Sequence, residues 1–121
     1  MLIVFAGSGF GGVVRYCMQT WVLKVYPSAF PLGTFIVNIL GCLLIGLFYA
    51  LSEKHNLLTT GWRLALTTGL CGGFTTFSAF AYENMNLLKT GDYINMGLYI
   101  AASVLLGIAA VFAGTFIIKA F

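Results

Sequence analysis

The stretch Gly69 to Glu83, which reads GLCGGFTTFSAFAYE, decides the fold of this chain. It lies inside an apolar segment, yet half of the residues from Gly69 to Phe80 are glycine, threonine or serine. A helix loses about 1 kcal/mol for each interior glycine relative to alanine, and Gly72 and Gly73 are adjacent. Hydroxyl side chains can also replace backbone hydrogen bonds locally. The pattern therefore predicts a membrane helix that is broken near its middle, where protein or a water-filled cavity covers the freed backbone groups.

Such a break has two interpretations. A glycine-interrupted apolar segment is typical of transporter ion sites, which use free carbonyls and the ends of half-helices. Phe77 and Phe80 are three residues apart, so a helix there places both rings on one face, and Glu83 continues that row. The alternative is a kinked packing helix whose phenylalanines face lipid, since glycine is common in membrane helices. The residues by themselves leave both interpretations open.

Composition places the whole chain in a bilayer. The 121 residues are 60% hydrophobic and 7% charged, whereas about 25% of the residues of a soluble domain are charged. A helix needs about 20 apolar residues to cross a bilayer, so the sequence predicts an all-α membrane protein with a single domain, residues 1–121. We expect four spans, at about residues 2–25, 32–51, 62–88 and 93–118. The net charge of +3 is scattered, which indicates no nucleic-acid partner.

Several reactive residue types carry no recognisable motif. Cys17, Cys42 and Cys71 lie in apolar segments without metal or redox spacing, so we interpret them as small apolar packing residues. His55 lies in the polar loop 52–61 and is expected to be solvated, without a role. No pair of nucleophile and base and no cluster of ligands indicates an enzyme.

The other segments carry isolated polar residues. In the first, Arg15 shares a stripe with two glycines and must face the bundle interior or a wet vestibule, or else extend to the headgroups. In the second, Asn38 offers two N–H donors and no charge that repels an anion, or it serves as a hydrogen bond between helices. In the fourth, Tyr99 and Ser103 share one face. They line an anion path or make ordinary helix contacts.

Residues 72–80, GGFTTFSAF, closely resemble the signature GGxTTFSTF of the Fluc (CrcB) fluoride channel family. Ala79 is the one departure at a fixed position. Weaker matches are GGVVRY at residues 11–16, GTFIVNILG at residues 33–41, and Tyr99 with Ser103 in the fourth segment. The resemblance covers all four apolar segments and thus nearly the whole chain.

The resemblance implies passive, selective export of fluoride from a bacterial cytoplasm, through two pores of an antiparallel, dual-topology homodimer in the inner membrane. It implies a fluoride path lined by Asn38, Thr76, Phe77, Ser78, Phe80, Tyr99 and Ser103. Arg15 would concentrate anions in a vestibule. The resemblance also implies a structural Na⁺ on the dimer axis, held by backbone carbonyls of Gly72 and Thr75 from both chains. Glu83 is a further candidate, with either a functional or a structural role.

The chemistry of fluoride agrees with these assignments. Fluoride is small and tightly hydrated, so a selective site must replace the hydrogen bonds of water as it removes them. The candidate donors are Asn38, Ser78, Tyr99 and Ser103. The ring edges of Phe77 and Phe80 carry the positive part of the aromatic quadrupole, so they can face an anion without binding it firmly. Permeation needs such weak sites in series.

The cationic residues give almost no orientation bias. Lys54, Arg63 and Lys119 flank one side of the predicted bundle, and Lys24 and Lys89 flank the other. Four short helices also cannot enclose a hydrated pore without leaving it open to lipid. Both observations favour an antiparallel dimer.

Two other classes of protein compete with a channel. A small dual-topology drug/proton exchanger has a similar length, but it uses a carboxylate buried in its first helix. Residues 2–25 contain no Asp or Glu, and Glu83 is the only candidate carboxylate within a span. A non-transporting membrane subunit is the second alternative. It would leave the glycine and threonine cluster and Arg15 without a purpose.

Overall fold

The computed structural model describes residues 1–26, 31–54 and 60–120. Every element in this part of the chain is a helix and none is a strand, which confirms the all-α prediction. In chain order the elements are α1 (Leu2–Val25), α2 (Leu32–Lys54), α3 (Thr60–Leu64), the π-helix η1 (Ala65–Cys71), α4 (Gly72–Phe74), α5 (Phe77–Lys89) and α6 (Tyr93–Ala120). His55, for which the sequence predicts a solvated position, lies outside the described residues.

Three segments of the described residues are long and apolar enough to cross a membrane. They are Leu32–Glu53, Gly61–Lys89 and Tyr93–Ala120, and they coincide with the second, third and fourth predicted spans. The chain is therefore a multi-pass membrane protein. The first predicted span is one continuous helix, α1, but it is not among these three. It is less hydrophobic on average than α2 and α6, because its second half carries Arg15 and Gln19.

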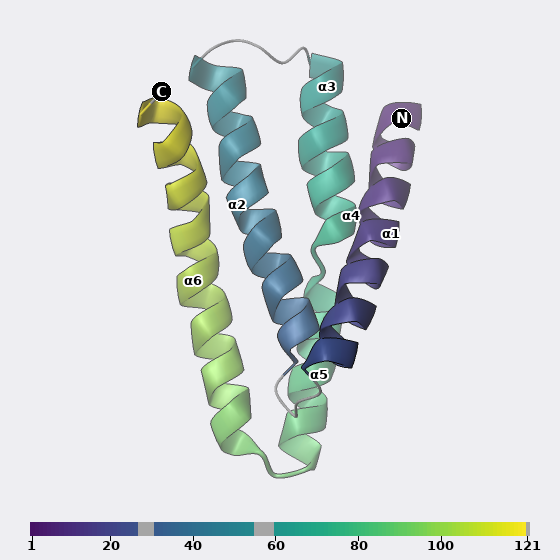
Figure 1. Ribbon diagram of the computed structural model, residues 1–121, viewed down its shortest axis with the longest axis vertical. Coiled ribbons are helices and arrows are strands. Elements are labelled where there is room, and N and C mark those ends of the chain that lie inside the picture. Colours follow the sequence, from purple (N-terminus) through teal and green to yellow (C-terminus); the bar gives the residue numbers. More distant parts are fainter. Residues whose placement is uncertain (27–30, 55–59, 121) are drawn as a thin grey trace.

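α2 and α6 lie side by side (Figure 1) and form the largest interface between two elements. Two glycines bring their backbones into contact. A Cβ atom at Gly46 would collide with the carbonyl oxygen of Val111, and one at Gly114 would lie 2.9 Å from the backbone nitrogen of Leu47. Small residues allow this close approach between membrane helices. The two glycines therefore set the distance between α2 and α6.

α1 packs against η1 and α4 in the same backbone-to-backbone manner. A Cβ atom at Gly7 would lie 2.6 Å from the carbonyl oxygen of Ala65, and one at Gly11 would collide with the backbone of η1. From the other side of the contact, a Cβ atom at Gly73 would lie 2.8 Å from Ser8 Cα. The glycine stripe of the first segment is thus a surface for helix packing, and it holds α1 against the broken segment.

The third segment is interrupted at Thr75 and Thr76, inside the predicted region. Both residues have extended backbones, with φ/ψ of −91°/155° and −150°/122°. Gly72 keeps helical angles of −64°/−38°, and Gly73 lies in the same short helix. The adjacent glycines therefore do not break the helix themselves. They permit close packing, and the chain leaves the helix just after them. The π-helical turn η1 before the break was not indicated by the sequence.

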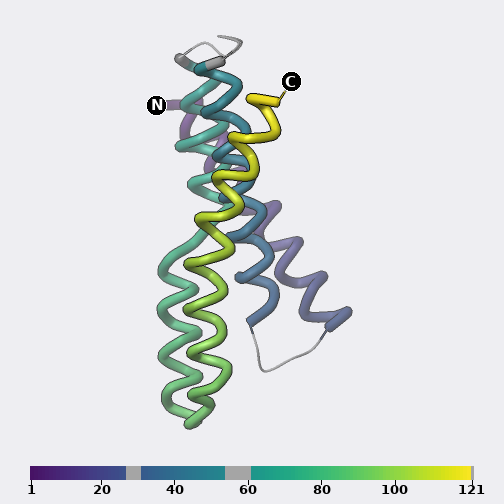
Figure 2. Tube along the Cα trace, turned by 90° about the vertical axis from the view of Figure 1, so that its left-hand side faces the viewer, coloured from purple at the N-terminus to yellow at the C-terminus, as the bar shows by residue number. Residues whose placement is uncertain are grey.

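α5 and the adjoining part of α6 form a hairpin that extends beyond the ends of α1 and α2 (Figure 1). Seen from the side, α1 and the first part of α2 lean away from this hairpin (Figure 2). The largest fully buried side chains, Val37, Cys71 and Tyr99, come from α2, η1 and α6. Many large hydrophobic side chains are exposed, among them Phe77 at 79% and Phe112 at 71%. Such exposure fits a chain that is surrounded by lipid.

Candidate functional site

Asn38 on α2 joins the two ends of the break. Its Oδ1 accepts a hydrogen bond of 2.9 Å from the backbone nitrogen of Thr76, and its Nδ2 donates to the Thr76 carbonyl oxygen at 3.3 Å. The side-chain amide therefore replaces a peptide partner for both backbone groups of Thr76, which the helix no longer satisfies. The amide nitrogen carries two hydrogens, and the bond to Thr76 uses one of them. The second remains available to a ligand.

Thr76 caps the start of α5. Its Oγ1 accepts from the backbone nitrogen of Ala79 at 3.3 Å and lies 3.1 Å from Ser78 Oγ. A threonine hydroxyl at this position satisfies one of the free N–H groups of a helix start. Asn38 and the capping hydroxyl together fix the direction in which α5 leaves the break.

A cavity of about 420 Å³ opens beside the break, and we call it the inner cavity. Its walls come from α2, the break, α5 and α6. The lining residues are Asn38, Gly41, Cys42, Ile45, Thr75, Thr76, Phe77, Phe80, Ser103, Val104 and Val111. None of them is charged. Five of the seven residues predicted for the fluoride path are in this group, and Ser78 and Tyr99 are not.

Ser103 is a lining residue of this cavity and carries a buried hydroxyl. Its Oγ is buried and forms no hydrogen bond with any of the described residues. A buried hydroxyl left unsatisfied costs about 1–3 kcal/mol, so such groups usually have a ligand or water to bind. Within the part of the chain that the structure describes, two hydrogen-bond donors on lining residues of the inner cavity have no partner, the Ser103 hydroxyl and the second hydrogen of the Asn38 amide.

Aromatic rings continue from the inner cavity into the bundle. The ring centroids of Phe77 and Phe80 are 5.7 Å apart, and those of Phe80 and Tyr99 are 4.9 Å apart. Tyr99 also meets Phe35 edge to face at 6.4 Å. The Tyr99 ring is fully buried, and its hydroxyl donates to Glu83 Oε1 at 3.3 Å. Tyr99 therefore supports Phe80 from behind.

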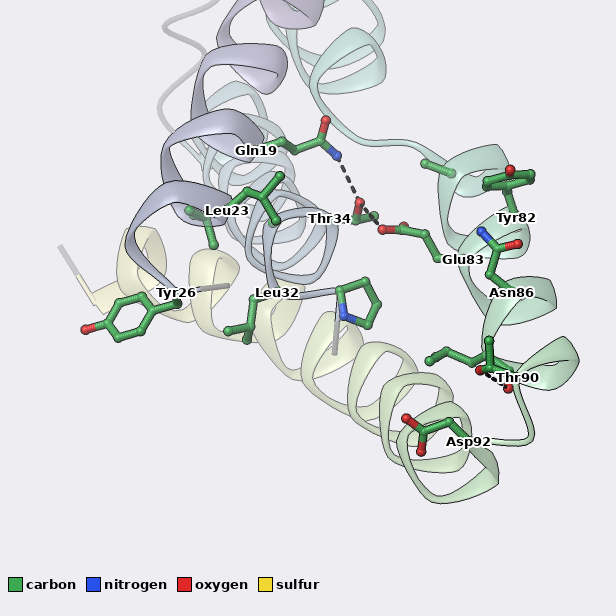
Figure 3. A pocket seen from close by; sticks show the side chains of 15 residues that line it. Gln19, Leu23, Tyr26, Leu32, Thr34, Tyr82, Glu83, Asn86, Thr90 and Asp92 are labelled. Carbon is green, nitrogen blue, oxygen red and sulfur yellow. Dashed lines mark hydrogen bonds between the residues drawn. The ribbon is translucent and has the colours of Figure 1, made fainter. Parts of the chain in front are cut away.

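Glu83 lies on a second cavity of about 690 Å³, which we call the outer cavity (Figure 3). This cavity separates the second half of α1 and the start of α2 from α5. The second oxygen of Glu83, Oε2, accepts from Thr34 Oγ1 at 3.1 Å, and Thr34 Oγ1 accepts from Gln19 Nε2 at 2.9 Å. Sequence reasoning did not single out Gln19. Its position four residues after Arg15, on the glycine stripe of the first segment, was the available signal.

Arg15 faces the bundle at the break. Its Nε donates to the carbonyl oxygen of Gly73 at 3.3 Å. That carbonyl is one of the backbone groups released by the interruption of the helix. Of the alternatives that the sequence left open, the structure therefore favours the bundle interior over the headgroups, and it brings a positive charge next to the break.

Two further carbonyl oxygens at the break lose their helical donors. In a continuous helix, the Gly72 carbonyl would accept from the Thr76 N–H, but that N–H donates to Asn38 Oδ1. In the same way, the Thr75 carbonyl would accept from the Ala79 N–H, which donates to Thr76 Oγ1 instead. Within residues 1–26, 31–54 and 60–120, neither carbonyl accepts a hydrogen bond. Carbonyl oxygens suit a hard cation. The same residues contain no group of three or more His, Cys, Asp or Glu side chains that could hold a metal.

A family model described as CrcB-like protein, Camphor Resistance (CrcB), matches residues 2–115. The chain is 48% identical over 114 residues to a protein of Phocaeicola vulgatus, an alignment that covers 94% of this chain and 93% of that one. It is 43% identical over 121 residues to a protein of Leptospira interrogans, with 100% and 95% covered. It is 48% identical over 120 residues to a protein of Bacteroides fragilis, with 97% and 94% covered. Each of the three relatives is named fluoride-specific ion channel FluC.

Proposed function

The chain belongs to the CrcB-like family, and from this premise we propose that it is a fluoride-selective ion channel of the bacterial inner membrane. It lets F⁻ leave the cytoplasm passively. The observation that carries this proposal is the inner cavity, because an uncharged lining with neutral hydrogen-bond donors and aromatic edges is suited to an anion in transit.

The donors of the inner cavity match the difficulty of moving fluoride. The ion gives up tightly held water, so it needs short hydrogen bonds from protein at the same moment. The Asn38 amide and the unpartnered Ser103 hydroxyl supply them. The edges of Phe77 and Phe80 supply weaker attraction, so the ion is not trapped. Arg15, outside the cavity lining, raises the local anion concentration without binding the ion there.

We propose that two copies form the channel, in an antiparallel, dual-topology homodimer with two pores. Three observations support this arrangement. Phe77 lines the inner cavity and is 79% exposed, so a second chain is needed to close the path against lipid. The cationic residues of the sequence favour neither orientation. α1, with 24 residues, is about 36 Å long and exceeds the roughly 30 Å hydrocarbon core, so it serves as the fourth span.

Labelling tests this arrangement. A cysteine introduced at Glu53, an exposed residue near the end of α2, should be labelled in comparable fractions from both sides of the cell membrane. Protein without the exposed Cys17 provides the background for this measurement. Labelling from one side alone would exclude the antiparallel dimer.

We also propose that the free carbonyls of Gly72 and Thr75, with their counterparts in the second copy, hold a structural Na⁺ on the two-fold axis. The bound ion joins the chains and adds a positive charge near the anion path. Replacing Na⁺ by N-methylglucamine should dissociate the dimer or stop the flux. Thr75→Val should retain both, because its hydroxyl is occupied by the Cys71 carbonyl at 2.9 Å. A dimer and a flux that survive complete Na⁺ removal would contradict this site.

The experiment for the channel itself is an efflux assay in liposomes. Purified protein is reconstituted in vesicles loaded with potassium fluoride, valinomycin provides a path for K⁺, and an electrode records the released fluoride. We expect rapid release of fluoride and none from matched chloride-loaded vesicles. Equal release of both anions, or of neither, would refute selective fluoride conduction. Efflux that depends on a proton gradient would instead favour the exchanger.

A further inference from the structure

Gly41 on α2 receives the side chain of Thr75 at the break. Gly41 is buried, and both residues line the inner cavity. A Cβ atom at position 41 would collide with Cγ2, the methyl carbon of Thr75. The next nearest atoms would be in van der Waals contact with it, Phe74 Cδ1 at 3.4 Å and Thr75 Cβ at 3.5 Å. The missing side chain of Gly41 therefore makes room for one methyl group.

The Thr75 side chain is held at both of its branches. Its methyl carbon occupies the space at Gly41, and its Oγ1 donates to the Cys71 carbonyl oxygen at 2.9 Å. The backbone nitrogen of Thr75 donates to the same oxygen, also at 2.9 Å. Because the methyl and the hydroxyl share one Cβ atom, a rotation that moves the methyl away from Gly41 also takes the hydroxyl from Cys71. A methyl added at position 41 is therefore not relieved by a free rotation of Thr75.

Gly41 and Asn38 contact consecutive residues of the break. They are three residues apart on α2, so they share one face of that helix. Asn38 bonds with both backbone groups of Thr76, at 2.9 and 3.3 Å. Gly41 contacts Thr75, the residue before it. The extended turn thus lies against α2 at two adjacent points, and a displacement of Thr75 from α2 would also pull Thr76 from the Asn38 amide.

We propose that Gly41 is a positioning residue for fluoride permeation. By making room for the Thr75 methyl, it sets the distance between the extended turn and α2. That distance keeps Thr76 bonded to Asn38, and so fixes the orientation of the amide that donates to the ion in the inner cavity. This inference rests on the proposed fluoride conduction.

A suppressor pair tests the proposal in the liposome assay, with flux expressed per assembled protein. We expect Gly41→Ala to lower fluoride flux at least about tenfold, because a methyl forced into a packed contact displaces its neighbours. Thr75→Ser removes the colliding methyl and retains the hydroxyl. The variant with both changes should conduct within about threefold of Thr75→Ser alone, because the two changes act through one contact.

Two matched controls locate the effect. Thr75→Val retains a methyl at Gly41, so it should not restore the flux of Gly41→Ala. Gly46→Ala collides instead with the carbonyl oxygen of Val111, a backbone atom of α6. Thr75→Ser should therefore restore neither the stability nor the flux of Gly46→Ala.

Three results would overturn the proposal. They are a flux in Gly41→Ala close to that of the unmodified chain, no recovery with Thr75→Ser, and equal recovery with Thr75→Val. If Gly41→Ala does not assemble, we expect Thr75→Ser, and not Thr75→Val, to restore both assembly and flux, and failure of that recovery would overturn the proposal as well.

Thermal unfolding of the same variants tests the contact without fluoride. The unfolding temperature should fall in Gly41→Ala and recover when Thr75→Ser is added, and a fall without recovery would contradict the contact between the two residues. An unmodified chain that releases no fluoride would refute the proposed function, and with it the role in permeation. The unfolding temperatures would still report on the contact, so the two failures are distinguishable.

Discussion

Replacing Asn38 by aspartate separates the two roles that this side chain has at the break. The aspartate can still accept from the Thr76 nitrogen, the bond of 2.9 Å, but it cannot donate to the Thr76 carbonyl at 3.3 Å. Loss of that donor leaves one buried acceptor unsatisfied, which costs about 1–3 kcal/mol of stability. Asn38→Leu loses both bonds, so the hydrogen-bond part of its destabilisation should be about twice as large.

The added charge of Asn38→Asp should also lower the flux. An ionised carboxylate about 4 Å from a fluoride ion repels it by about 4 kcal/mol at an effective dielectric constant of about 20. Since about 1.4 kcal/mol corresponds to a factor of ten, flux should fall by about 10³.

The assay measures fluoride efflux from liposomes together with the elution volume and thermal unfolding of the same preparation. Asn38→Leu is the matched comparison. It loses both bonds with Thr76 and carries no added charge. An Asn38→Asp variant that keeps its assembly and conducts within tenfold of the unmodified chain would refute the placement of the ion path beside Asn38.

Three further variants test the walls of the inner cavity and the helix packing. Phe80→Ile should lower fluoride flux at least about tenfold because the ring edge is lost. Phe112→Ile changes an exposed ring away from both cavities and should not lower the flux. Equal flux in the two variants would exclude a role for the Phe80 ring. Ser103→Ala should lower fluoride flux and leave the unfolding temperature unchanged or slightly higher. The reason is that it removes a buried hydroxyl that has no partner among the described residues. A marked loss of stability would show that the hydroxyl is satisfied within the protein. Gly46→Ala should destabilise the fold strongly because its Cβ meets the backbone of α6. Gly97→Ala has open space around its Cβ and should gain up to about 1 kcal/mol of stability. Thermal unfolding in detergent compares the two variants, and similar unfolding temperatures would contradict the packing.

The sequence was sufficient where the signal is local or compositional. Apolar runs and their lengths located the three described segments that are long and apolar enough to cross a membrane, and the bounds expected for the first segment are those of α1. The periodicity of Gly7, Gly11 and Arg15 predicted one shared face, and that face packs on the broken segment. The interruption itself was also predictable, since glycine and hydroxyl residues in an apolar run disfavour a continuous helix. The motif around it indicated the family directly.

The tertiary structure decided how the break is made and what surrounds it. The helix ends at Thr75 and Thr76, and the adjacent glycines stay helical, because Asn38, 38 residues away in the sequence, supplies a donor and an acceptor to Thr76. The hydrogen bonds that join Gln19, Thr34, Glu83 and Tyr99 depend on contacts between four helices. Local periodicity does not specify which polar groups of different helices meet. Inside a bilayer every such group needs a partner, and only the packed bundle determines which partner each one finds.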